Sequence, residues 1–142
     1  GCTIDVTALP VEEDDPGLSA TEAIERYLAS GLPRERLTCS SDGAGCLPTF
    51  DAEGQLVAMD VGRPAELTRT LTELLARGHA AEDVVPFFTS NVSKLLKLRR
   101  KGRIAAGADA DLVALNADGT VRLVVARGRV RHPSPTPSKY TP

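Results

Sequence analysis

The stretch LTCSSDGAG, residues 37–45, decides the fold. Residues 37–41 predict a short strand, which breaks at residues 42–45, where two glycines let the backbone turn tightly. A carboxylate that ends a strand and precedes a glycine turn lies at the catalytic face of a parallel barrel. Asp42 is therefore a candidate site residue, although Asp-Gly is also a common turn pair and a plain turn role stays open.

The flanking residues make this strand part of the second of two similar units. Residues 3–7 form an alternating β-branched run that predicts a strand. Ser19 precedes Glu22 by three residues, the capping-box arrangement, and the apolar stripe that follows predicts a helix as far as Gly31. Downstream we expect a hairpin over residues 50–57, a helix from Pro64 to Gly78 and a second helix over about residues 82–98.

This order of strands and helices predicts parallel strands with right-handed crossovers, and hence an α/β sheet or barrel. Two such units do not close a barrel, because a (β/α)₈ barrel needs roughly 250 residues. After Gly102 the pattern changes, and Ile104, residues 112–115 and residues 121–125 predict a small β-element. Residues 132–142 hold four prolines among polar residues, which predicts a disordered tail.

Composition and charge exclude several classes of partner. A net charge of -2 and a pI near 5.7 give no basic footprint for nucleic acid. No apolar run approaches the roughly 20 residues that cross a bilayer, and no export leader is visible, so we expect no membrane partner and a cytoplasmic location. The three cysteines lack zinc-finger spacing, and the two histidines, His79 and His132, each stand alone, so no structural zinc site is expected.

Several motifs carry a resemblance to a known superfamily. Residues 89–98, 101–104 and 107–113, closing on residues 126–128, resemble the C-terminal signature of the amidohydrolases. Residues 1–7 and 38–48 look more narrowly like the last two barrel strands of isoaspartyl (β-aspartyl) dipeptidases. The resemblance implies an α/β fold made of the last two βα units of a metal-dependent-hydrolase barrel over residues 1–98, a small β-domain segment over 99–131 and the tail over 132–142.

The resemblance also implies a site. The dipeptidases' catalytic aspartate maps onto Asp42, which implies a zinc ligand and a general base that takes a proton from a hydroxide bridging two zinc ions and passes it to the leaving amine. The substrate-binding serine of that family maps onto Cys46, whose thiol is a poorer hydrogen-bond donor. The remaining zinc ligands of the family lie on strands one to six, which match nothing in this chain. An isoaspartyl dipeptide is the implied substrate, and a homo-oligomer is the implied state of the full-length enzyme.

Other interpretations stay open. A deacylase or dihydroorotase-like amidohydrolase is the enzymatic alternative, and a non-catalytic remnant or interaction module is the alternative outside enzymes. Asp5, a charged residue in a strand, is interpreted as a surface or strand-pairing residue. Residues 99–101 form a cationic patch that we expect to complement a helix dipole.

Overall fold

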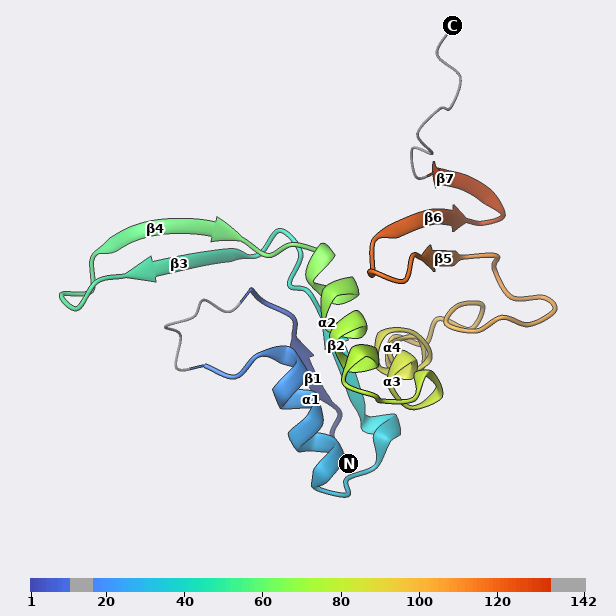
Figure 1. Ribbon diagram of the computed structural model, residues 1–142, viewed down its shortest axis with the longest axis horizontal. Coiled ribbons are helices and arrows are strands. Elements are labelled where there is room, and N and C mark those ends of the chain that lie inside the picture. The colour runs from blue at the N-terminus through green and yellow to red at the C-terminus, as the bar shows by residue number, and fades with distance from the viewer. Residues whose placement is uncertain (11–16, 134–142) are drawn as a thin grey trace, which may run out of the picture.

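Two parallel strands, a long hairpin and a three-stranded sheet are joined by helices in this protein. The structure, a computed structural model, describes residues 1–10 and 17–133. Figure 1 shows the arrangement. In chain order the elements are β1 (Ile4–Thr7), α1 (Ala20–Ala29), the 3₁₀ turn η1 (Arg34–Arg36), β2 (Leu37–Ser40), β3 (Cys46–Phe50), β4 (Leu56–Val61), α2 (Ala65–Ala76), α3 (Ala81–Phe88), α4 (Ser90–Leu95), β5 (Leu112–Leu115), β6 (Val121–Ala126) and β7 (Arg129–Pro133).

The parallel pair β1–β2 is the centre of the fold. Its register runs from Ile4 opposite Leu37 to Thr7 opposite Ser40, and α1 lies in the connection between the two strands. The predicted capping box starts α1, because the Ser19 hydroxyl accepts a hydrogen bond from the Glu22 N–H at 3.2 Å and the Ser19 N–H donates to the Glu22 carboxylate at 3.0 Å. The α/β prediction is confirmed.

One face of this strand pair is covered by helices. Leu37 and Cys39 of β2 are buried among side chains of α1, α2 and α3, including those of Ile24, Leu74 and Phe87. Removing a side chain such as that of Phe87 from water stabilises the fold by about 1.5–3 kcal/mol. Helix packing on one face of the pair therefore sets the position of β2.

The opposite face of the pair is polar. Both carboxylate oxygens of Asp5 accept hydrogen bonds across the pair, from the hydroxyls of Thr38 and Ser40, each at 2.6 Å. Asp5 and Thr38 are also opposite each other in the strand register. The interpretation of Asp5 as a strand-pairing residue is confirmed.

The prediction of one helix over residues 82–98 is wrong. Helix α3 ends at Phe88 and α4 begins at Ser90, because Thr89 between them has a non-helical backbone with φ of -135° and ψ of -87°. Pro86 inside α3 has no N–H for the helical ladder, and the Thr89 hydroxyl donates to the Val85 carbonyl at 2.8 Å. The apolar periodicity runs through the break and so could not reveal it.

The C-terminal sheet also differs from the prediction. It has the antiparallel order β5-β6-β7, and Ile104, predicted as part of a strand, lies outside it with 90% of its surface exposed. The predicted start of the disordered tail at residue 132 falls inside β7, where His132 pairs with Val124 and Pro133 with Leu123. A proline is tolerated there because β7 is an edge strand. Residues 134–142, the rest of that predicted tail, lie outside the described residues.

Ion pairs stabilise the loop between α4 and β5. Asp109 bonds Arg100 at 2.9 Å and Lys101 at 3.2 Å, and Lys101 also bonds Asp111. The other Asp111 oxygen accepts the Arg127 N–H at 2.7 Å, which joins the loop to the sheet. The expected dipole role of residues 99–101 is therefore wrong, because it is Lys94 that lies in the last turn of α4.

Within residues 1–10 and 17–133 no helix is long and apolar enough to span a bilayer.

The three thiols should differ in reactivity. Burial, and secondarily the charge of Asp5, raises the pKa of Cys39 to about 12, whereas Cys2 and Cys46 are exposed. Only the thiolate is the reactive form. We expect a disulfide reagent at pH 8 to modify two thiols in the native chain and three in denaturant. A Cys39→Ala variant should give two in both conditions, and three fast thiols in the native chain would contradict the packing of β2 against the helices.

Acid should weaken the attachment of the C-terminal sheet. The hydrogen bond from Lys101, followed by that from the Arg127 N–H, holds the pKa of Asp111 below its usual value of 3.8. A carboxyl group with a lowered pKa in the folded state stabilises the fold above its unfolded pKa, and this stabilisation is lost as the pH falls through the folded-state value. We expect Asp111→Asn to lower Tm at pH 7 and to lower it less near pH 3, measured by circular dichroism. Glu53→Gln is the control, since Glu53 is exposed and far along the chain in the hairpin turn. An equal Tm difference for Asp111→Asn at both pH values would show that the charge of Asp111 is not involved.

Candidate active-site turn

Asp42 lies at the carboxyl end of β2. The strand ends at Ser40, and Asp42 then adopts a left-handed backbone with φ of 45°. Aspartate is among the few residues that tolerate this conformation. The Gly45 N–H donates to the Asp42 carbonyl at 2.7 Å and closes the turn. The sequence prediction that a glycine turn follows the strand is confirmed.

Gly62, which follows β4 at the base of the hairpin, holds this turn in place. The Ala44 N–H donates to the Gly62 carbonyl and the Gly62 N–H donates to the Gly45 carbonyl, both at 2.9 Å. A Cβ atom on Gly62 would lie 2.2 Å from the Asp42 carbonyl oxygen, so only glycine fits. Sequence reasoning missed Gly62, whose only local signal is its place between the hairpin and the proline that opens α2.

The carboxylate of Asp42 is free to react. A Cβ atom on Gly45 would lie 2.4 Å from its Oδ2 atom, so the carboxylate lies over the Gly45 backbone, beside the start of β3 at Cys46. Both Asp42 and Cys46 are exposed. Among the described residues the Asp42 side chain has no hydrogen bond or ion pair. An exposed carboxylate without a partner can accept a proton or bind a cation.

The described residues do not complete a metal site. Over residues 1–10 and 17–133 there is no group of three or more His, Cys, Asp or Glu side chains that could hold an ion. His79 instead bonds Glu25 of α1 at 3.1 Å, and this hydrogen bond, helped by the charge of Arg77 and opposed by burial, lowers the pKa of the Glu25 carboxyl. His132 lies in β7. Asp42 is thus a single candidate ligand, and catalytic zinc usually has three protein ligands.

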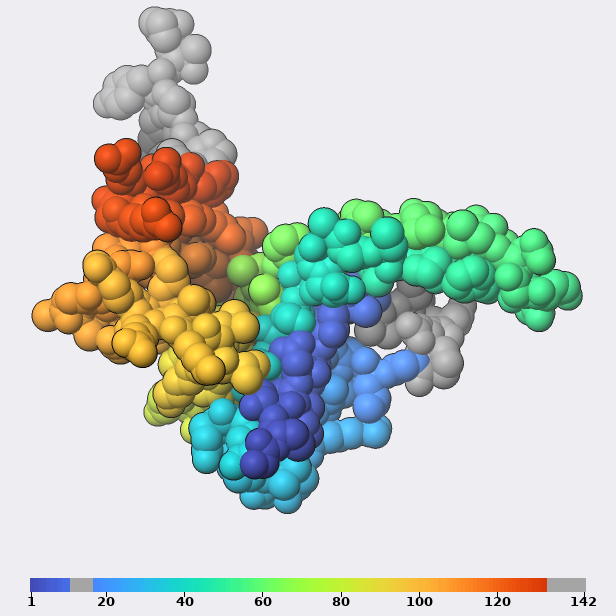
Figure 2. Space-filling model, turned by 180° about the vertical axis from the view of Figure 1, so that it is seen from behind, coloured from blue at the N-terminus to red at the C-terminus, as the bar shows by residue number. Residues whose placement is uncertain are grey.

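The hairpin that starts at the turn projects from the body. Figures 1 and 2 show β3 and β4 extending clear of the helices. Every β4 residue is exposed, and Met59 keeps 56% of its surface accessible. The predicted hairpin over residues 50–57 is therefore too short, since pairing runs from Cys46 opposite Val61 to Phe50 opposite Leu56.

Comparison with known proteins gives concordant matches. The amidohydrolase family model matches residues 11–131. A β-aspartyl dipeptidase from Fervidobacterium islandicum AW-1, solved in complex with β-Asp-Leu dipeptide, is 34% identical with a TM-score of 0.77, over 92% of this chain and 33% of that one. An allantoinase from Streptomyces avermitilis is 41% identical over 96 residues, 66% of this chain and 21% of the relative.

A more distant structure shows a likeness of fold alone. An N-acetylglucosamine-6-phosphate deacetylase from Thermotoga maritima has a TM-score of 0.62 at 20% identity, over 90% of this chain and 38% of that one.

The chain spans about a third of the length of the dipeptidase and about a fifth of the length of the allantoinase.

The contact between Gly62 and the Asp42 backbone can be tested by one methyl group. Gly62→Ala would force the two segments apart, and overpacking of this kind costs about 1–3 kcal/mol. We expect a lower free energy of unfolding in urea. Gly43→Ala is the matched control, because its Cβ would meet only side-chain atoms, of Ser41 at 3.2 Å and Pro64 at 3.3 Å. Equal losses for both variants would mean that the turn is not clamped at Gly62.

Proposed function

Because this chain belongs to the amidohydrolase family, we propose that it forms the last two barrel units of a β-aspartyl dipeptidase, with Asp42 as its catalytic carboxylate. The observation that carries the proposal is the unpartnered carboxylate of Asp42 at the carboxyl end of a parallel strand. The substrate class, an isoaspartyl dipeptide, is supported by 34% identity to the Fervidobacterium dipeptidase, which was solved with β-Asp-Leu.

The chemistry assigned to Asp42 is proton transfer. Its carboxylate takes a proton from the water that attacks the amide carbonyl and delivers it to the leaving amine. Its exposure and its lack of a partner leave both oxygens available for this role. Asp42 lies beyond the last paired residue of β2, so its carboxylate is not used across the strand pair as that of Asp5 is.

Amidohydrolases generally use metal ions, and zinc, bound in part by Asp42, belongs to the proposal. The described residues supply one candidate ligand, so they do not form the binuclear site implied by the resemblance. The other ligands would have to come from residues outside those described.

Cys46 is proposed as a substrate contact. It starts β3 immediately after Gly45, over whose backbone the Asp42 carboxylate lies, so the two side chains leave the same turn. A thiol donates a weaker hydrogen bond than the serine hydroxyl of the dipeptidases. The contact with substrate should therefore be weaker here. A cytoplasmic location and a homo-oligomeric full-length enzyme complete the proposal.

A second enzymatic activity has support of its own. The allantoinase from Streptomyces avermitilis has the higher identity, 41%, although over fewer residues than the dipeptidase match covers. Both activities use an amidohydrolase fold, so the Asp42 role is common to them. Assays of the full-length enzyme with allantoin and with β-Asp-Leu separate the two, and turnover of an N-acyl amino acid or of dihydroorotate without turnover of either would indicate a deacylase or dihydroorotase-like activity.

The 142-residue chain alone should not hydrolyse dipeptides. One candidate ligand does not hold a catalytic zinc, which usually has three protein ligands and an open position. We expect no release of leucine from β-Asp-Leu, with or without added zinc, beyond a metal blank. Turnover well above that blank would mean that the described residues contain a site that we have missed.

The role of Asp42 can be measured in a graft of this segment onto the first six strands of a related isoaspartyl dipeptidase. Asp42→Asn should lower kcat/KM toward the upper end of the about 10²- to 10⁴-fold range of general-base loss, with the fold intact. Glu53→Gln in the hairpin turn is the control and should leave kcat/KM unchanged.

In the same graft, Cys46→Ser should preserve or raise activity, because it restores a hydroxyl donor. If the Asp42→Asn graft kept near-normal turnover, Asp42 would not be the catalytic carboxylate, and its role would be to form the turn after β2.

A further inference from the structure

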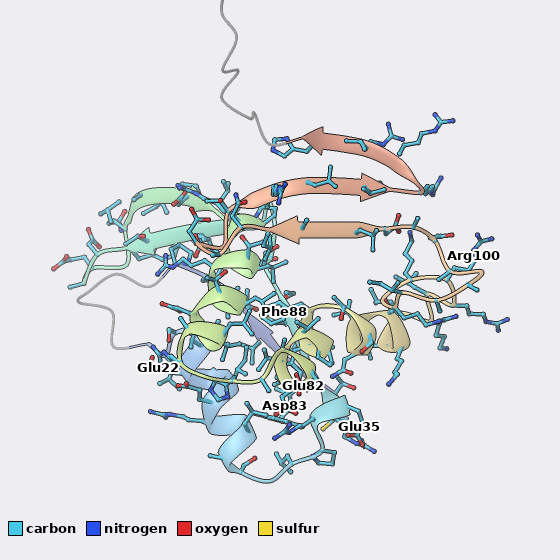
Figure 3. The ribbon with its side chains drawn as sticks, turned by 45° about the vertical axis from the view of Figure 1, so that its right-hand side comes forward. Glu22, Glu35, Glu82, Asp83, Phe88 and Arg100 are labelled. Atoms are coloured by element: carbon cyan, nitrogen blue, oxygen red, sulfur yellow. The ribbon has the colours of Figure 1, made fainter. Side chains whose placement is uncertain are left out.

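The charges of this chain are strongly segregated along its length. Residues 94–133 hold ten of the 17 Lys and Arg residues but three of the 19 acids. Residues 94–103 alone hold six cations and no acid. The net charge of -2 therefore conceals a basic region that follows an acidic one. Figure 3 shows Arg100 on the outer loop, away from Glu35, Glu82 and Asp83.

This basic region forms a hollow between α4 and the loop after it. The hollow has a volume of about 410 Å³, and no carboxylate lines it. In Figure 2 the segment containing it lies at the outer edge of the body. Five cationic side chains line it: Lys94, Lys97, Arg99, Lys101 and Arg103.

Three of these cations lack a compensating acid. Lys101 is neutralised by Asp109 and Asp111. Lys94 also borders the neighbouring hollow that contains Glu35, Glu82 and Asp83. Lys94 and the other three cations, Lys97, Arg99 and Arg103, have no ion pair among the described residues, and those three share no hollow with an acid. Like charges that share one concave surface repel each other, and an anion would relieve that repulsion.

Neutral hydrogen-bond donors line the same hollow. Ser90 and Ser93 are half-buried there, and neither hydroxyl has a hydrogen-bond partner among the described residues. By contrast the neighbouring Thr89 hydroxyl is used within its own helix, donating to the Val85 carbonyl. Guanidinium and hydroxyl donors around one hollow match a ligand with several anionic oxygens.

We propose that this hollow binds a small polyvalent anion that carries phosphoryl groups, through Arg99, Arg103 and Lys97 with Ser90 and Ser93 as neutral donors. The arginines favour phosphoryl oxygens because the planar guanidinium donates two parallel hydrogen bonds to them. The concave shape and limited volume favour a small ligand over an extended chain. This site uses no residue of the Asp42 turn, so it stands or falls independently of the proposed dipeptidase activity.

The test is isothermal titration of the 142-residue chain with tripolyphosphate at 150 mM NaCl. We expect saturable binding of one ligand per chain, weakened about tenfold or more by the pair Arg99→Gln and Arg103→Gln, since each removes charge-assisted hydrogen bonds. The matched control is the pair Arg122→Gln and Arg129→Gln, which removes the same charge from the C-terminal sheet and should change the affinity less than about threefold. Circular dichroism confirms that all variants are folded.

Several results would overturn the assignment. Equal weakening by the two variant pairs would show diffuse attraction to the basic region, and no saturation at 150 mM NaCl would show a solvated surface. Equal affinity for citrate would show selection by charge alone, without phosphoryl recognition. Salt-sensitive self-association lost in the Arg99 and Arg103 variants would assign the surface to the acidic part of a second copy. Tighter binding of an oligonucleotide would assign it to nucleic acid.

Discussion

The parallel pairing of β1 with β2 is the constraint on which the rest of the structure depends. Parallel strands cannot be joined by a tight turn, so the chain must cross over through α1, and the crossover covers one face of the pair. Leu37 and Cys39 enter that covered face, which leaves Thr38 and Ser40 on the other face with Asp5. The alternation of side chains along a strand thus separates a core from a polar face within four residues.

The candidate site follows from where β2 is forced to stop. Pairing ends at Ser40, and the chain leaves the sheet through the left-handed backbone of Asp42. Such a backbone persists only if its surroundings hold it, and here Gly62 does so by approaching from the end of β4. The exposed hairpin therefore has a structural role at its base, because its pairing brings Gly62 back to the turn.

Elements with local signals could be predicted from the sequence, and those that depend on distant contacts could not. The capping box at Ser19 and the glycine turn after Ser41 identify α1 and the end of β2, because each acts through neighbours in the chain. The clamp at Gly62 depends on a contact with a separate segment of the chain. The break at Thr89 and the pairing of β7 have local causes, but the apolar periodicity runs through the break and the prolines after Arg131 indicate disorder. For the site, sequence motifs indicated Asp42 and Cys46 but could not indicate what holds Asp42 in place.

The net charge of this chain does not indicate where on its surface a charged ligand could bind. At physiological ionic strength a charge is screened over about 8 Å, so a ligand responds to the groups within that distance and scarcely to the sum over the molecule. Glu25, for example, is satisfied by Arg77 and His79 and contributes nothing to a ligand elsewhere. Arg99 and Arg103 have no such partner among the described residues, so their charge is available. An acidic protein can in this way present a basic binding surface, and the distribution of ion pairs in the structure reveals it where the pI does not.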